Sequence, residues 1–221
     1  MLTLGPSFER PSAAVLALFH DLPVATVSDV LGPGHAMQAR IKPLAPGMRV
    51  LGPALTLRLP PMDNLGMHLA VKEAQAGDVI VCDQQGAALA APVGEIMACA
   101  ARHQSLAGIV LDGSVRDAAK LRTGGWPVFA VDVTAQQCRK DGPAWLRVPI
   151  TCGGVQVRPG DIVLGDDDGV VVVPLERAEA VAREAADKAG KESQRIAAIG
   201  RGLVSPAWLD DTIRRVGIVQ N

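Results

Sequence analysis

Short apolar runs alternate with amphipathic stretches through the middle of the chain. Three of the runs are rich in Val, Ile and Leu, which is typical of buried strands, and the stretches beside them carry apolar residues at helical spacing. The predicted elements, in order, are helix 64–76, strand 79–83, helix 93–104, strand 108–112, helix 115–123 and strand 127–131. Strands that alternate with helices in this way indicate an α/β fold with parallel neighbouring strands.

The two ends of the chain have other patterns. Ser12 precedes an apolar stretch and is expected to cap a helix there. Beyond residue 133, glycine pairs and an Asp-Gly pair separate short runs of β type. The elements predicted in these parts are helix 12–20, helix 26–31, strand–kink–strand 50–59, strands 148–157, 161–164 and 170–173, helix 175–199 and a short helix after Pro206. No repeat or linker divides the chain, so we expect residues 1–221 to form a single α/β domain with a mixed sheet.

Composition limits the classes of function. Apolar residues make up 48% of the 221 residues and charged residues 20%, which is enough apolar material for a folded core. The net charge is −1, aromatic residues are only 3%, and tyrosine is absent. These values argue against nucleic acid as a partner. The sequence has no N-terminal signal pattern and no long unbroken apolar run, which predicts a cytoplasmic protein that does not enter membranes.

The four cysteines are widely spaced and form no C-x-x-C pair; they are Cys82, Cys99, Cys138 and Cys152. Cys82 and Cys99 lie in apolar stretches, and we expect them to be buried free thiols. This pattern favours a reducing compartment over disulfide bonds or a zinc site.

Charged residues follow two of the predicted strands at matching positions. Glu95 stands near the start of one helix, and Arg116-Asp117 stands near the start of the next. Because parallel neighbouring strands end at the same edge of a sheet, the first turns of these helices are expected to meet there. Two carboxylates and a guanidinium beside helix-start N–H groups can hold a divalent metal and an α-keto carboxylate together. On local pattern alone, such residues are more often exposed surface charges.

Other candidate sites have less support. The run Asp166-Asp167-Asp168-Gly169 lacks the closing glutamate of a calcium loop, so a hairpin turn is the better interpretation. Asp112 ends a strand and is expected to cap the following helix. The four histidines show no ligand spacing, and we assign them no metal. A Schiff-base lysine is not favoured, because the lysines lie in polar or helical-surface contexts; they are Lys42, Lys72, Lys120, Lys140, Lys188 and Lys191.

Several segments along the chain resemble, in order and register, the segments of a known family. They include Ser28-Asp29-Val30-Leu31-Gly32, Gly52-Pro53-Ala54-Leu55-Thr56, Asp112-Gly113-Ser114-Val115-Arg116-Asp117 and Asp168-Gly169-Val170-Val171-Val172-Val173-Pro174. From about residue 26 to about residue 202, the chain resembles the 4-hydroxy-4-methyl-2-oxoglutarate aldolase and oxaloacetate decarboxylase family, which also contains the regulator of ribonuclease E activity (RraA). Its aldolase members carry an acidic residue, twenty intervening positions and then Arg-Asp, and Glu95 stands at this spacing before Arg116-Asp117.

The resemblance implies a swivelling-type β/β/α sandwich that assembles as a homotrimer or homohexamer, with active sites between subunits. Residues 175–221 would pack on a neighbouring subunit, where Glu192 would face the metal. The implied cofactor is Mg²⁺ or Mn²⁺, which agrees with ligands that are all oxygen atoms. We expect Asp117 to be the direct ligand, and Glu95 and the neighbour's Glu192 to act through metal-bound waters.

The implied activity is that of a class II, metal-dependent lyase that forms pyruvate. Its substrates would be 4-hydroxy-4-methyl-2-oxoglutarate or 4-carboxy-4-hydroxy-2-oxoadipate, with oxaloacetate decarboxylation through the same pyruvate enolate. The predicted catalytic residues are Glu95, Arg116 and Asp117. Arg116 would bind the substrate carboxylate with paired N–H donors. The backbone N–H groups expected to assist it are those of Gly94, Glu95, Ile96 and Met97.

The chain departs from the family pattern directly after Arg-Asp. Aldolase members usually have further acidic residues there, whereas this chain has Ala118-Ala119-Lys120-Leu121-Arg122. Lys120 or Arg122 could meet a second substrate carboxylate, although a solvated helix face is the simpler role for both. Two alternatives therefore stay open, a lyase for a different oxo-acid and a non-catalytic protein that binds ribonuclease E. Regulatory members tend to lack the first acid, so Glu95 favours an enzyme.

Overall fold

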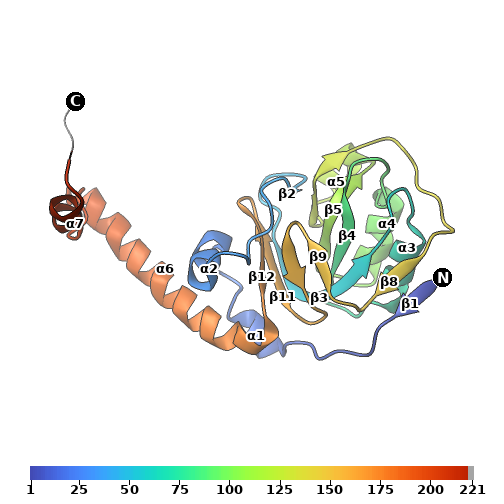
Figure 1. Ribbon diagram of the computed structural model, residues 1–221, viewed down its shortest axis with the longest axis horizontal. Coiled ribbons are helices and arrows are strands. Elements are labelled where there is room, and N and C mark those ends of the chain that lie inside the picture. The colour runs from blue at the N-terminus through green and yellow to red at the C-terminus, as the bar shows by residue number, and fades with distance from the viewer. Residues whose placement is uncertain (219–221) are drawn as a thin grey trace.

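A ten-stranded mixed sheet forms the centre of the computed structural model, which describes residues 1–218. Its ten strands are β1 Leu2–Leu4, β2 Lys42–Pro43, β3 Val50–Arg58, β4 Val79–Ala87, β5 Gly108–Val115, β6 Val128–Ala130, β7 Asp132–Val133, β8 Ala144–Leu146, β11 Ile162–Asp166 and β12 Gly169–Val173. Two further strands, β9 Ile150–Cys152 and β10 Val155–Val157, form a separate antiparallel sheet. The central strands β3, β4, β5 and β6 are parallel neighbours, and β8, β11 and β12 join through antiparallel pairs. The predicted α/β class with a mixed sheet is confirmed (Figure 1).

Helices and hairpins cover opposite faces of the parallel strands. The helices are α1 Ala13–Ala17, α2 Val24–Leu31, α3 Leu65–Glu73, α4 Glu95–His103, α5 Ala118–Thr123, α6 Ala178–Gly200 and α7 Leu209–Val216, with a short 3₁₀ turn, η1, at Leu175–Arg177. Ile80 of β4 packs with α3, α4 and α5 in one apolar cluster, whereas Val81 packs with β9, β10 and β12 in another. Successive residues of a strand point to opposite faces, so β4 is buried on both sides.

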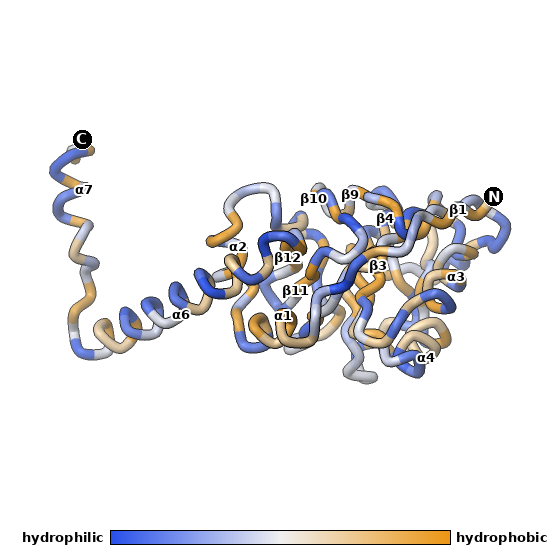
Figure 2. Tube along the Cα trace, turned by 90° about the horizontal axis from the view of Figure 1, so that it is seen from below, coloured by the Kyte–Doolittle hydropathy of each residue, from blue (hydrophilic) through white to orange (hydrophobic). Residues whose placement is uncertain are grey.

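A third apolar cluster joins α2 and α6 to the outer side of the β11–β12 hairpin. The buried residues of α6 end at Ala185, and the rest of the helix leaves the body of the molecule with α7 at its far end (Figure 1). The segment beyond Ala185 still carries apolar side chains, which alternate with polar ones along it (Figure 2). Ile196, Leu203 and Trp208 are each more than 60% exposed. We call residues 186–218 the C-terminal arm.

The strand–kink–strand prediction for residues 50–59 is wrong, because β3 is one strand of nine residues. Its first part, as far as Pro53, pairs with β11, and its second part, from Ala54, pairs with β4. Proline lacks an N–H donor and normally interrupts a ladder. Here it stands where the strand changes partners, and the strand continues through it.

Local signals at turns and helix ends behave as predicted. The Ser12 hydroxyl accepts a hydrogen bond from the Val15 N–H at 3.2 Å, so it caps α1, although the helix ends earlier than expected. Asp166 pairs with Gly169 at the closed end of the β11–β12 hairpin, which confirms the turn interpretation of the acidic run. The helix predicted over 175–199 is present as η1 followed by α6, and the short final helix is α7.

Candidate functional site

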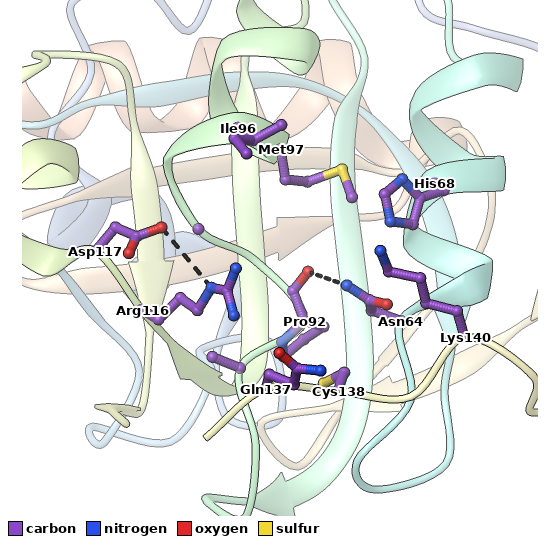
Figure 3. Close-up of a pocket in the computed structure, with 12 residues that line it drawn as sticks. Asn64, His68, Pro92, Ile96, Met97, Arg116, Asp117, Gln137, Cys138 and Lys140 are labelled. Atoms are coloured by element: carbon purple, nitrogen blue, oxygen red, sulfur yellow. Dashed lines mark hydrogen bonds and ion pairs between the residues drawn. The ribbon is translucent and has the colours of Figure 1, made fainter. Parts of the chain in front are cut away.

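The carboxyl ends of β3, β4 and β5 lie at one edge of the sheet, and a helix begins beside each of them. A cavity of about 150 Å³ opens at this edge (Figure 3). Its lining comes from α3, α4, the β5–α5 turn and the irregular segment before β8; the lining residues are Asn64, His68, Ala91, Pro92, Gly94, Ile96, Met97, Arg116, Asp117, Gln137, Cys138 and Lys140. We call this cavity the edge pocket.

Arg116 and Asp117 lie together on one side of the edge pocket (Figure 3). The prediction that both residues stand in the first turn of a helix is wrong, because β5 continues to Val115 and α5 begins only at Ala118. Asp117 adopts a left-handed backbone, with φ of 56°, in the turn between β5 and α5. Its Oδ2 atom accepts a hydrogen bond from the Glu95 N–H at 3.0 Å and lies 3.8 Å from Arg116 Nε. The carboxylate is thus held against the N-terminus of α4.

Gly94 permits this close approach. A Cβ atom added at position 94 would lie 2.4 Å from Asp117 Oδ2 and 2.9 Å from Arg116 Cγ. The backbone of Gly94 is extended, with φ of −143°, so its conformation does not require glycine. Glycine is required instead by the close contact with the Asp117 and Arg116 side chains.

Glu95 is the first residue of α4, as predicted, but its side chain is not part of the edge pocket. It lines a separate groove between α4 and α5, together with Arg102, Lys120 and Trp126. Successive helical residues point about 100° apart, so Ile96 and Met97 face the pocket while Glu95 turns to the groove. Glu95 therefore reaches the site through its backbone N–H, and its predicted contact with a metal-bound water stays a prediction.

The opposite wall of the edge pocket contains Asn64, His68 and Lys140, none of which was predicted to have a role (Figure 3). Asn64 Nδ2 donates to the Pro92 carbonyl oxygen at 3.3 Å, while the buried Asn64 Oδ1 has no partner among the described residues. Burial and then the Lys140 charge lower the pKa of His68, which keeps the imidazole neutral near pH 7. Lys140 is exposed, in agreement with its polar context in the sequence, and it lines the pocket because the irregular segment that carries it passes over the sheet edge.

Part of this wall could have been found from the sequence. The strand that ends at residue 58 is followed by a helix, so the edge argument used for Glu95 and Arg116 applies equally to Asn64 and His68. No comparable signal exists for Lys140, since the path of residues 134–143 depends on tertiary contacts such as the bridge between Ala91 and Gln137.

Glu192 lies on α6, which leaves the body on the side away from α4 and α5 (Figure 1). Its Oε2 accepts a hydrogen bond from the Thr26 hydroxyl at 3.2 Å. One chain therefore does not bring Glu192 to its own edge pocket. Within residues 1–218, no three His, Cys, Asp or Glu side chains come close enough together to hold a metal ion.

Two further predictions about single residues are corrected. Asp112 caps no helix; its carboxylate is buried, pairs with the Arg40 guanidinium at 2.9 Å and accepts from the Gly153 N–H at 3.0 Å. Cys82 is a buried free thiol as expected, but Cys99 is exposed and lines the groove between α4 and α5. Along the described part of the chain, no helix has the length and apolar content needed to cross a membrane.

Comparison with known proteins gives consistent matches. Residues 24–172 match the RraA-like family, described as Aldolase/RraA. A protein of Halalkalibacterium halodurans, provisionally named 4-hydroxy-4-methyl-2-oxoglutarate aldolase, is 36% identical over 196 residues, which cover 88% of this chain and 93% of that protein.

Two solved structures are also similar. An uncharacterized protein from Pseudomonas syringae pv. tomato has a TM-score of 0.78 at 27% identity, covering 88% of this chain and 96% of its own. RraAS2 of Streptomyces coelicolor, described as an unusual member of the RNase ES inhibitor RraA protein family, has a TM-score of 0.76 at 30% identity, covering 86% of this chain and 98% of its own.

Proposed function

Because the chain belongs to the RraA-like family, we propose that it is a cytoplasmic, divalent-metal-dependent lyase that releases pyruvate from a 4-hydroxy-2-oxo di- or tricarboxylate and decarboxylates oxaloacetate. The observation that carries this proposal is the position of Asp117 and Arg116 in one pocket, with the Asp117 carboxylate held by the N-terminus of α4. An anchored carboxylate beside a guanidinium is the arrangement needed to bind a cation and a keto-acid carboxylate side by side.

The donor set of the edge pocket fits a hard cation. Asp117 makes both of its contacts through Oδ2, so Oδ1 can serve as a ligand. Its oxygen atoms, with water and the substrate, suit Mg²⁺ or Mn²⁺ better than zinc. When bound, the cation supplies Lewis acidity toward the keto acid. Glu95 and a neighbouring subunit's Glu192 are proposed to act through bound waters.

The remaining groups of the pocket orient the substrate. Arg116 takes the carboxylate next to the keto group with paired N–H donors. The N–H groups of Ile96 and Met97 lie in the first turn of α4, have no carbonyl partner within the helix, and favour the same anion. Lys140, on the opposite wall, takes the second carboxylate. The neutral imidazole of His68 lies on that wall and can hydrogen-bond a hydroxyl of the substrate.

We propose that the C-terminal arm packs on a neighbouring subunit in a homotrimer or homohexamer, whereas residues 178–185 of the segment expected to do so pack on the hairpin of their own chain. The C-terminal arm has no buried residue in this chain, yet its exposed apolar side chains include Ile196, Ile199, Leu203, Val204 and Trp208. Apolar surface of this extent is typical of a protein–protein interface. Contact with another copy would cover it and would bring Glu192 to the neighbour's edge pocket.

The activity is tested by following pyruvate release from 4-hydroxy-4-methyl-2-oxoglutarate and from oxaloacetate. We expect release from both, complete loss with EDTA, and recovery with Mg²⁺ or Mn²⁺. Borohydride added with pyruvate should leave the protein mass unchanged, because no imine forms. Activity that survives EDTA, together with a borohydride-trapped adduct on Lys140, would replace the metal-dependent mechanism with a Schiff-base one.

Lys140 provides a test of substrate class. Lys140→Met keeps the apolar stem and removes the charge, so we expect KM for oxaloacetate to rise roughly 10- to 100-fold, as for the loss of a charged hydrogen bond. Inhibition by pyruvate, which has one carboxylate, should change little. Lys72→Met, an exposed lysine of α3, is the matched control. Equal weakening of oxaloacetate and pyruvate would place Lys140 at the first carboxylate instead.

A second candidate function is binding to ribonuclease E without chemistry, prompted by the naming of the Streptomyces relative. A pull-down with the C-terminal region of ribonuclease E, combined with the absence of pyruvate release from a panel of oxo-acids, would favour it. Release from a different oxo-acid in that panel would identify a lyase of other specificity.

A further inference from the structure

Four side chains form a connected network where α6 crosses α2. The Thr26 hydroxyl donates to Glu192 Oε2 at 3.2 Å, and Lys188 Nζ lies 3.5 Å from Glu192 Oε1. Lys188 Nζ also lies 3.1 Å from Asp29 Oδ2. We propose that Thr26 and Lys188 are positioning residues that set the direction of the Glu192 carboxylate, so that it meets the edge pocket of a neighbouring subunit. This inference rests on the proposed function, in which Glu192 serves that pocket.

Thr26 is suited to hold a carboxylate in place. It is buried, with 4% of its surface exposed, and lies within α2. It is the third residue of α2, and its hydroxyl reaches across to another element, α6. Its β-branched side chain has few rotamers, so the donor keeps one direction.

Lys188 engages the other oxygen of Glu192. Its Nζ also contacts Asp29 Oδ2, which ties the ammonium group to α2. The ion pairs of Lys188 are well exposed and add little to the stability of the fold. Both oxygens of Glu192 thus have a neighbour, one the hydroxyl of a buried threonine and the other an exposed ammonium group, and the two contacts together favour one direction of the carboxylate.

The position of the network along α6 supports this role. The last buried residue of α6 is Ala185, and Glu192 stands seven residues further, about 10 Å along the helix axis. The contacts with Thr26 and Asp29 therefore attach α6 to the body just before the helix becomes free. They fix where the C-terminal arm begins as well as where Glu192 points.

The test compares Thr26→Val, Thr26→Ser and Glu192→Gln, with Glu179→Gln as a control on the same helix that removes only a local pair with Arg183. Outer-shell partners of a metal site typically change affinity or activity 10- to 100-fold. We expect Thr26→Val to weaken Mn²⁺ binding, followed by the electron paramagnetic resonance of free Mn²⁺, and to lower kcat, each about 10-fold. Thr26→Ser should restore both values. If Thr26→Val has normal Mn²⁺ binding and kcat while Glu192→Gln is impaired in both, the positioning role alone is overturned. If Glu192→Gln itself has normal values, the proposed use of Glu192 is overturned.

Mixed oligomers separate positioning from simple damage to the fold. A Thr26→Val subunit keeps an intact edge pocket, and an Asp117→Ala subunit keeps an intact Glu192. Refolded mixtures of these two variants should therefore regain activity, because some sites combine the two intact halves. Mixtures of Thr26→Val with Glu192→Gln should not. The control mixture combines Glu192→Gln with Asp117→Ala and should also regain activity. If the control regains activity and the mixture of Thr26→Val with Asp117→Ala does not, Thr26 acts within its own pocket.

Discussion

Replacing Asp117 with alanine is expected to lower kcat/KM for pyruvate release by roughly 10³-fold, because a Lewis-acid metal is worth several kcal/mol to charge development on the keto acid. Mn²⁺ binding should weaken in parallel. Alanine suits the left-handed backbone at position 117 less well than aspartate and lacks the contact with the Glu95 N–H, so the melting temperature should also fall, by about 2–4 °C. Activity and Mn²⁺ binding, measured on the same preparation, check this result.

Two controls define the Asp117 experiment. Asp117→Asn keeps the size of the side chain and its contact with the start of α4 but lacks the anionic ligand, so it should be nearly as inactive as alanine. Asp21→Asn alters an exposed aspartate and should behave as wild type. If Asp117→Asn keeps full activity and undiminished Mn²⁺ binding, Asp117 is not a metal ligand, and the proposed mechanism lacks its direct ligand.

Gly94→Ala is expected to reduce kcat/KM by about 10²-fold with little effect on folding. The added methyl would lie 2.4 Å from Asp117 Oδ2, so the carboxylate must leave its hydrogen bond with the Glu95 N–H. A displacement of about 1 Å at a catalytic group can cost this much activity. The extended backbone at Gly94 accepts alanine without strain, so the loss should come from the contact alone. Steady-state kinetics and thermal melting check this.

The matched control is Gly190→Ala, in the middle of α6. A Cβ atom there meets nothing within 4 Å, and alanine is the better helix former by about 1 kcal/mol. Position 190 lies in the C-terminal arm close to Glu192, so this variant controls for stability alone and should melt at a slightly higher temperature than wild type. A Gly94→Ala enzyme with wild-type kinetics would mean that the tight contact between the α4 start and Asp117 has no part in catalysis.

The order of the longer strands and helices was predictable because each buries apolar residues at its own local period. The short strands β1, β2, β7 and β8 were not predicted, because two or three residues show no such period. The ends of the elements were less predictable, because pairing with neighbouring strands determines them. β4 continues to Ala87 and β5 to Val115, beyond the predicted ends at 83 and 112, since each pairs with neighbours that the local pattern does not reveal. The change of partner at Pro53 was hidden for the same reason.

The candidate site was predictable to a similar depth. Sheet topology alone brings Arg116 and Asp117 to one edge, and the structure places both in the edge pocket. The direction of the Glu95 side chain was not accessible, because shifting a helix start by one residue rotates a side chain by about 100°. Lys140 was missed because it lies in an irregular segment, whose path is set by contacts across the fold.

The unbroken strand β3 has a consequence for how copies of the chain can meet. Its first half pairs with the hairpin layer that supports α6, and its second half pairs with β4 beside the edge pocket. A paired strand rises about 3.3 Å per residue and resists bending. The pocket and the Thr26–Glu192 contact are therefore held at a fixed separation by β3. In the proposed oligomer, copies that meet through these two sites would keep this spacing, so the length of β3 would help to set the geometry of the assembly.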